Sequence, residues 1–156
     1  MRHMEPKFED REAFTVMGVT VHSEPDAVDF GALWQEEFTP HHEAIRGISA
    51  DDAYYGVWFP PQADGIPDYV AGMAVPDEAP LPVGLIKRRV PASRYAVFEC
   101  SVETIGATYQ RIYETWLPSS SYERTPDGVD LEVYPPEDAV DVSPAVYIPV
   151  REKRSG

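Results

Sequence analysis

Three short stretches of this chain occur twice, in the same order and at similar spacing. The pairs are Thr15–Val21 with Ala96–Val102, Phe38–Pro40 with Trp116–Pro118, and Val57–Pro61 with Glu132–Pro136, separated by 81, 78 and 75 residues. Repetition at a nearly fixed spacing indicates a duplicated supersecondary unit. The duplication limits the possible folds, because one copy alone would expose its sheet edge and its apolar face.

Residue periodicity assigns the elements within each copy. Alternating, β-rich stretches predict strands at Phe14–Val21, Ala53–Phe59, Tyr69–Val75, Tyr95–Val102, Val129–Tyr134 and Ala145–Val150. Apolar residues at three- and four-residue steps predict helices over Asp26–Phe38 and Glu103–Leu117. Pro25 suits a first helical turn, and we expect Pro40 and Pro118 to end the two helices.

The two copies are thus predicted to be strand-helix-strand-strand (βαββ) modules, at residues 8–75 and 90–150. The proline-rich connector at residues 76–82 is too short to separate independent domains. We predict a single α+β domain over residues 1–156, with the modules related by a pseudo-two-fold axis. Both helices would cover one face of an antiparallel sheet, and a ligand cleft would lie between the modules.

Two glutamates interrupt otherwise β-rich strands. Within Asp130–Tyr134, alternation puts Leu131 and Val133 on one face and Glu132 on the other. We expect the aliphatic pair to face the helices and Glu132 to face the groove between the modules. Glu99 interrupts the other strand in the same way, so either acid could be the buried one. A carboxylate buried among aromatic rings would have a raised pKa or await a cation.

Charge and cysteine content exclude several classes of protein. The chain has 27 Asp and Glu against 13 Lys and Arg, for a net charge of −14, which repels a nucleic-acid backbone. The single Cys100 forms no internal disulfide, and no apolar run is long enough for a membrane span. We expect a cytoplasmic protein without direct nucleic-acid or membrane partners. The acidity fits either a salt-loving source or an ordinary acidic protein.

Motifs for metal binding and catalysis are missing from the sequence. His41 and His42 are adjacent and point apart, and no Cys or His cluster completes a metal site. Cys100 has no basic neighbour, and neither a hydrolase elbow nor a phosphate-binding glycine loop occurs. We therefore expect no metal, no cofactor and no conventional catalytic residue.

Aromatic residues are abundant, with nine Tyr, six Phe and three Trp. Aromatic walls around an acid form a receptor for a lipophilic cation. A half-exposed tyrosine ladder is the alternative interpretation.

Several motifs carry a family resemblance. They are Tyr95–Glu99, Glu114–Pro118, Asp130–Pro135 and Tyr147–Arg151, with looser matches at Phe14–Val19 and Tyr55–Phe59. Together they resemble the GyrI-like family, which includes the effector-binding domains of AraC- and MerR-type regulators. The resemblance covers nearly the whole chain, and the Asp-x-Glu-x-Tyr strand is its most specific part. It implies paired βαββ modules of the SHS2 type that bind diverse, often cationic and aromatic, small molecules.

The resemblance also implies roles for individual residues. Glu132 would be the counter-ion, and Tyr147 on the last strand would close the pocket. Combined with the other aromatic residues, the candidate ligand-binding set is Glu132, Tyr134, Tyr147, Phe98, Trp58, Tyr55 and Trp116. No helix-turn-helix precedes the strand at Phe14, so we expect that this chain does not bind DNA by itself.

Three functions follow from these observations. The first is a stand-alone module that senses or sequesters lipophilic, cationic small molecules. The second is hydrolysis of a strained, cyclopropane-type electrophile in the same pocket, with Glu132 as the catalytic acid or base. The third is an acidic interaction module that acts on a topoisomerase, which the even spread of acids along the chain makes weaker.

Overall fold

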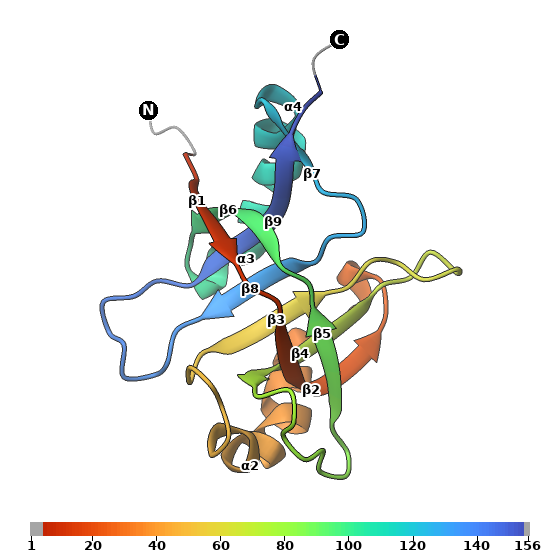
Figure 1. Cartoon of the computed structure of the whole chain (residues 1–156), viewed down its shortest axis with the longest axis vertical. Coiled ribbons are helices and arrows are strands. Elements are labelled where there is room, and N and C mark those ends of the chain that lie inside the picture. Colours follow the sequence, from red (N-terminus) through yellow and green to blue (C-terminus); the bar gives the residue numbers. More distant parts are fainter. Residues whose placement is uncertain (1–4, 155–156) are drawn as a thin grey trace.

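Nine strands form one antiparallel sheet in the computed structural model, which describes residues 5–154 (Figure 1). The strands are β1 (Lys7–Arg11), β2 (Phe14–His22), β3 (Tyr54–Trp58), β4 (Asp68–Val75), β5 (Ile86–Val90), β6 (Ser93–Glu99), β7 (Tyr122–Arg124), β8 (Asp130–Tyr134) and β9 (Ala145–Glu152). Their order is β1-β6-β9-β8-β3-β4-β2-β5, and β7 pairs with β9 outside this row. The predicted α+β class with an antiparallel sheet is confirmed, and residues 1–4 and 155–156 of the predicted domain lie outside the described range.

The strand order is symmetric about the central pair of β3 and β8. Moving outward, β4 matches β9, β2 matches β6, and β5 matches β1. Each module runs from its first strand through a helical segment to two further strands of the row, as the duplicated pattern predicted, and the second module has the short β7 in addition. The strand that precedes each module pairs with the other module, β1 with β6 and β5 with β2. The pairing of β3 with β8 joins the modules into one continuous sheet, and the exchanged strands β1 and β5 form its two edges.

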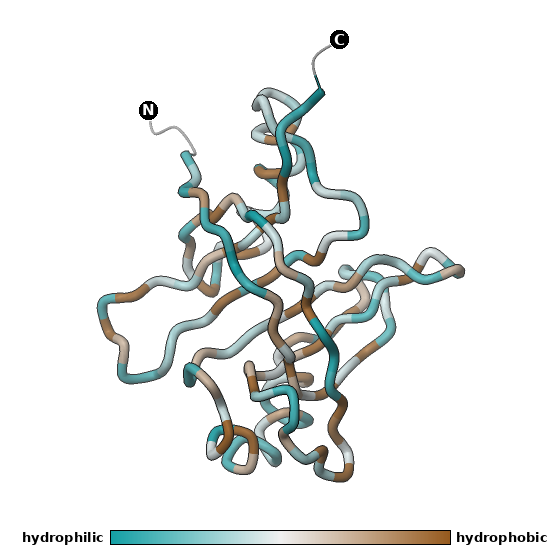
Figure 2. Tube along the Cα trace, viewed as in Figure 1, coloured by the Kyte–Doolittle hydropathy of each residue, from teal (hydrophilic) through white to brown (hydrophobic). Residues whose placement is uncertain are grey.

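Strands β1, β5 and β7 were not predicted from the sequence. Residues 7–11 and 86–90 contain mostly charged side chains, and Figure 2 shows these outer strands largely in hydrophilic colours. Charges are common on edge strands, where they discourage pairing with other chains. Such strands show no apolar alternation, so periodicity alone could not find them.

Two helical segments cover one face of the sheet. The first contains a 3₁₀ turn (Pro25–Ala27), α1 (Phe30–Ala32), a π-helical stretch (Leu33–Phe38), a 3₁₀ turn (Thr39–His41) and α2 (His42–Arg46). The second contains a 3₁₀ turn (Val102–Thr104), α3 (Ile105–Arg111), a π-helical stretch (Ile112–Trp116) and α4 (Leu117–Ser119).

The expectation that Pro40 ends the first helix was wrong. Pro40 lies in the first turn of a 3₁₀ segment, a position that tolerates proline, and the chain stays helical to Arg46. Pro118 likewise lies within α4, and the helix ends one residue later at Ser119.

Both faces of the sheet are buried. On the helix-bearing face each module has its own core, with Leu33 and Ile45 in one and Ile112 in the other. A third cluster contains only residues from strands and loops, Leu131 among them, and Val133 packs against it. The expectation that Leu131 and Val133 face the helices was therefore wrong. Alternation assigns residues to two faces, but it cannot tell which of two buried faces carries the helices.

Arg11 at the end of β1 lies within the helix-free face. Its guanidinium is 5.6, 5.4 and 5.2 Å from the ring centres of Phe14, Tyr55 and Tyr147, and it donates a hydrogen bond of 2.9 Å to the Tyr55 hydroxyl. These rings come from β2, β3 and β9, so Arg11 connects three strands. We call this arrangement the Arg11 cage.

Replacing Arg11 with Met keeps much of the side chain's length and removes its charge. We expect the free energy of unfolding to fall by about 1–3 kcal/mol, because cation–π contacts and a charged hydrogen bond are lost in a partly desolvated site. Urea unfolding measures the change. Arg94→Met is the control, because the half-exposed Arg94 lies over Phe8 at 5.5 Å on the surface. Equal losses in both variants would contradict a special role for the cage.

Candidate functional site

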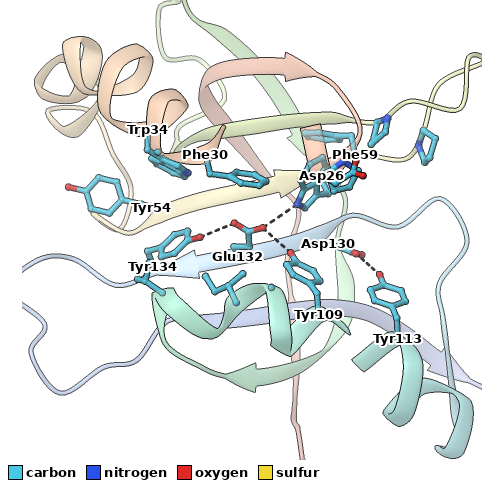
Figure 3. Close-up of a pocket in the computed structure, with 18 of the residues that line it drawn as sticks. Asp26, Phe30, Trp34, Tyr54, Phe59, Tyr109, Tyr113, Asp130, Glu132 and Tyr134 are labelled. Carbon is cyan, nitrogen blue, oxygen red and sulfur yellow. Dashed lines mark hydrogen bonds between the residues drawn. The ribbon is translucent and has the colours of Figure 1, made fainter. Parts of the chain in front are cut away.

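A cavity of about 1070 Å³ opens on the helix-bearing face where the two modules meet (Figure 3). The first module lines it with its helical segment, β3 and the β3–β4 loop, and the second with its own helical segment, β7 and β8. Much of the wall is aromatic, from Phe30, Trp34, Trp58, Tyr109 and Tyr134. A large, mostly apolar cavity with a few polar groups is typical of a small-molecule site.

The carboxylate of Glu132 lies between the two modules and is only 3% exposed. Its Oε1 accepts hydrogen bonds from the hydroxyls of Tyr69 (3.0 Å) and Tyr134 (2.9 Å). Its Oε2 accepts from the indole N–H of Trp58 and the hydroxyl of Tyr109, both at 3.1 Å. A carboxylate has about four lone-pair positions, so neutral donors occupy all of them. We call these five residues the Glu132 network.

No side chain within residues 5–154 provides a cationic partner for Glu132. Among the described residues no Lys, Arg or His forms an ion pair with it. Burial raises the pKa of Glu132, and the four hydrogen bonds partly offset this rise. Burial and the nearby carboxylate also raise the pKa values of Tyr69, Tyr109 and Tyr134, so these hydroxyls stay protonated and act as donors.

Gly56 on β3 provides the space for this network. It lies directly opposite Glu132 in the pairing of β3 with β8. A Cβ atom at this position would be 2.1 Å from the Tyr69 hydroxyl oxygen and 2.6 Å from Glu132 Oε1. Any larger residue would therefore push the buried tyrosine and the carboxylate out of position.

Three of the seven predicted ligand-binding residues line the cavity, namely Glu132, Tyr134 and Trp58. Glu132 is also the buried member of the two glutamates considered from the sequence. Glu99 is exposed and lies 3.4 Å from the ammonium of Lys7.

The other four predicted residues do not line the cavity. Tyr55 and Tyr147 point to the helix-free face and form part of the Arg11 cage. Phe98 and Trp116 pack in the helix-face core of the second module, with ring centres 5.1 Å apart. Alternation along β3 does put Tyr55 on the opposite face of the sheet from Tyr54 and Trp58. Only the packing of the helices shows that the cavity lies on the face of Tyr54 and Trp58.

Several lining residues were not assigned to the site from the sequence, among them Phe30, Trp34, Tyr109 and Asp130. Tyr109 had a recognisable signal, because it brings a hydroxyl into an apolar helical stripe. Its contact with Glu132 depends on how α3 packs on β8, which the stripe does not specify.

The β3–β4 loop borders the cavity through Phe59 and three prolines, and His22 holds this loop. The imidazole Nε2 of His22 is 2.7 Å from Asp64, and its Nδ1 is 2.7 Å from Asp68. Arg88 also pairs with Asp68 at 3.0 Å and lies 3.7 Å from the Phe59 ring centre. Both ring nitrogens face carboxylates, so the geometry suits the doubly protonated imidazolium. These hydrogen bonds raise the pKa of His22.

Residues 7–150 match the family model of Cass2, described as an integron-associated effector binding protein. The chain belongs to the Cass2 family. The match spans both modules and every element that lines the cavity, and the GyrI-like resemblance found in the sequence is confirmed. As a Cass2 protein, the chain is a small-molecule effector-binding module.

Other relatives agree with this assignment. The transcriptional regulator BrlR of Pseudomonas aeruginosa is 33% identical over 136 residues, which are 86% of this chain and 49% of BrlR. The chain thus spans about half the length of this curated relative.

Two solved structures show the same fold. SAV2435 bound to tetraphenylphosphonium has a TM-score of 0.78 at 16% identity, covering 95% of this chain and 94% of that chain. The integron cassette protein VCH_CASS2 of Vibrio cholerae has a TM-score of 0.60 at 18% identity, covering 94% and 96%.

The described part of this Cass2 protein contains no helix with the length and hydrophobicity required to cross a membrane. Within residues 5–154, no three His, Cys, Asp or Glu side chains come together as a metal site, and His42 instead contacts the Tyr54 hydroxyl at 2.6 Å.

Replacing Gly56 with Ala tests the space requirement of the Glu132 network. We expect the free energy of unfolding to fall by about 1–3 kcal/mol, the usual cost of overpacking a buried site. Gly106→Ala is a matched control, because Gly106 lies in α3 and a Cβ there meets nothing within 4 Å. This control should hold or gain stability, since Ala favours helices. Chemical unfolding compares the two, and an unchanged Gly56→Ala variant would contradict the steric argument.

The His22 contacts predict a pH dependence of stability. Because the pKa is raised in the folded state, their contribution is complete below the ordinary value of 6.5 and is lost as pH rises through the folded-state pKa. The difference in unfolding free energy between wild type and His22→Gln should therefore shrink as pH increases. Asp64→Asn removes one carboxylate partner of His22. In a protein that carries this substitution, His22→Gln should therefore change the unfolding free energy by less than it does in the wild type. A pH-independent difference would show that the imidazolium is not involved.

Proposed function

We propose that this Cass2 protein captures lipophilic cations that carry aromatic rings and have no hydrogen-bond donors, with Glu132 as the counter-ion. The observation that carries the proposal is a buried carboxylate without a cationic partner at the wall of a large aromatic cavity. Binding would serve sensing or sequestration, with no bond made or broken.

The hydrogen bonding of Glu132 supports the absence of donors in the ligand. A primary amine would need a free lone pair on the carboxylate, and all four are occupied by the Glu132 network. A delocalised or quaternary cation needs only the charge, which acts across several ångströms and more strongly in a poorly hydrated cavity. Such a cation can bind without displacing any of the four donors.

The aromatic walls support the same class of ligand. Trp34 and Phe30 line one side, and Tyr109 and Tyr134 line the other (Figure 3). Trp58 also lines the cavity. Aromatic faces attract cations and also bury flat apolar groups, so they favour a ligand that has both properties.

The relatives support this reading. SAV2435, which has the same fold, is bound to tetraphenylphosphonium, a lipophilic cation without N–H or O–H groups. BrlR is a transcriptional regulator and about twice as long as the matched region, which supports effector sensing as one use of the module.

The same geometry favours binding over hydrolysis. A general base must accept a proton from water, and a carboxylate whose lone pairs all accept hydrogen bonds has no free position for it. Product analysis after incubation with a cyclopropane-bearing alkylator tests this inference. Conversion of the substrate by the wild-type protein would overturn it.

Replacing Glu132 with Gln removes the charge and keeps the shape. Glutamine can retain the four contacts, because its carbonyl can face Trp58 and Tyr109 while its amide donates to the hydroxyls of Tyr69 and Tyr134. The unfolding free energy at neutral pH should therefore hold or rise, since an unpaired buried charge is removed.

Affinity for a monocation should fall in Glu132→Gln by about 1–3 kcal/mol, the range for a charge-assisted contact. The probes are N-methyl-para-phenylpyridinium and its uncharged counterpart para-methylbiphenyl, together with tetraphenylphosphonium. Binding is followed by tryptophan fluorescence, because Trp34 and Trp58 line the cavity.

Affinity for para-methylbiphenyl should stay the same in Glu132→Gln. The control Glu99→Gln, at an exposed residue, should change neither the affinity for the cations nor that for para-methylbiphenyl. Equal losses for the charged and uncharged probes would contradict the counter-ion role. No saturable binding of any cation to the wild type would overturn the proposed function.

A further inference from the structure

A second buried carboxylate shares the wall of the cavity with Glu132. Asp130 is 8% exposed and lies two residues earlier on β8, so both side chains point to the same face. At a rise of about 3.3 Å per residue, their Cα atoms are about 6.6 Å apart. Besides the exposed Asp26, the cavity wall therefore contains two buried acids at a Cα spacing that one small dication could bridge.

The two acids differ in how they are compensated. Arg124 contacts Asp130 Oδ1 through Nη2 at 2.8 Å and Nε at 3.0 Å, and the Tyr113 hydroxyl donates to Asp130 Oδ2. Glu132 receives neutral donors only. Arg124 is the one cationic side chain among the described residues that line the cavity. The charges of the buried Asp130 and Glu132 and of the half-buried Arg124 thus sum to a single negative charge.

Arg124 is also held in place by the backbone. Its Nη2 donates to the carbonyl oxygen of Gly128 at 2.8 Å, and its Nη1 donates to that of Thr125 at 3.3 Å. Swinging the guanidinium away from Asp130 would break these contacts as well as the ion pair. A ligand cation therefore meets a fixed positive charge where Arg124 and Asp130 line the cavity.

We propose that Arg124 is a specificity-determining residue, which selects ligands with one positive charge over ligands with two. It does so by neutralising Asp130, the second buried acid of the cavity. This inference rests on the proposed function, because it assumes that cations bind at Glu132. A dication would have to bring its second charge close to the guanidinium or displace it from Asp130, and like charges in a poorly hydrated site repel strongly.

Three probes of nearly the same shape test the inference. They are para-methylbiphenyl with no charge, N-methyl-para-phenylpyridinium with one, and methyl viologen with two at opposite ends. Because a dication costs more to dehydrate, the informative quantity is the ratio of monocation to dication affinity, compared between variants. Fluorescence titration or calorimetry measures this ratio.

Replacing Arg124 with Met should shift the ratio toward methyl viologen by about tenfold or more. The reason is that Asp130 then has no cationic partner in the protein and can attract the second charge of methyl viologen at close range. Arg124→Lys, which keeps the charge, should preserve the wild-type ratio. The double variant Arg124→Met with Asp130→Asn removes both charges, so it should restore preference for the monocation. A purely structural role of Arg124 would not be rescued by the second substitution.

A pH series gives a second readout. Burial raises the pKa of Asp130, and Arg124 opposes that rise, so the Met variant should take up a proton more readily at Asp130. Methyl viologen binding to that variant should strengthen as pH increases, whereas monocation binding to the wild type should not follow the same curve.

The outcomes separate this inference from the proposed function. If the wild type binds the monocation and the ratio is unchanged in Arg124→Met, Arg124 does not set the charge selectivity. If the wild type binds methyl viologen more tightly than the monocation, the inference is also overturned, even when Arg124→Met fails to fold. If the wild type binds neither cation nor tetraphenylphosphonium, the proposed function itself fails.

Discussion

The cavity is organised around the cost of keeping the Glu132 carboxylate out of water. An unsolvated charge is tolerated in a protein interior only when donors replace its hydration, and here four neutral donors do so. Two come from β3 and β4 of the first module and two from α3 and β8 of the second. The hydrogen bonding of the buried carboxylate therefore depends on the correct docking of both modules. In turn, the carboxylate ties the two modules together where their surfaces meet.

The two modules are alike in topology but contribute different chemistry at their junction. In the pairing of β3 with β8, Gly56 lies directly opposite Glu132. One module supplies the acid, and the other supplies the absence of a side chain that lets Tyr69 reach it. A duplicated fold thus gives an asymmetric cavity, with one buried acid that has no cationic partner among the described residues and one buried acid paired to Arg124.

Aromatic rings surround a charged side chain in two places, on opposite faces of the same sheet. In the Arg11 cage the cation belongs to the protein, and the rings of Tyr55 and Tyr147 are part of the core. Around Glu132 the rings border a cavity that contains an acid instead. The same side-chain chemistry is used for stability on the face without helices. On the other face, where the two helical segments leave a gap between them, it lines a site.

The sequence by itself determined the class of fold, the duplication and the six apolar strands, and it picked out Glu132, Tyr134 and Trp58, which line the cavity. The strands follow from local periodicity, the duplication from the repeated stretches, Glu132 from an acid placed where a β-rich strand should be apolar, and the two aromatic residues from the aromatic content and the family resemblance. The tertiary structure decided which buried face carries the helices, and so moved Tyr55 and Tyr147 into the Arg11 cage and Phe98 and Trp116 into the core. It also decided that Tyr69 and Tyr109 meet Glu132 and that Arg124 meets Asp130. Periodicity describes one element at a time, whereas a buried charge is held by donors from several elements, and only their packing brings those donors together.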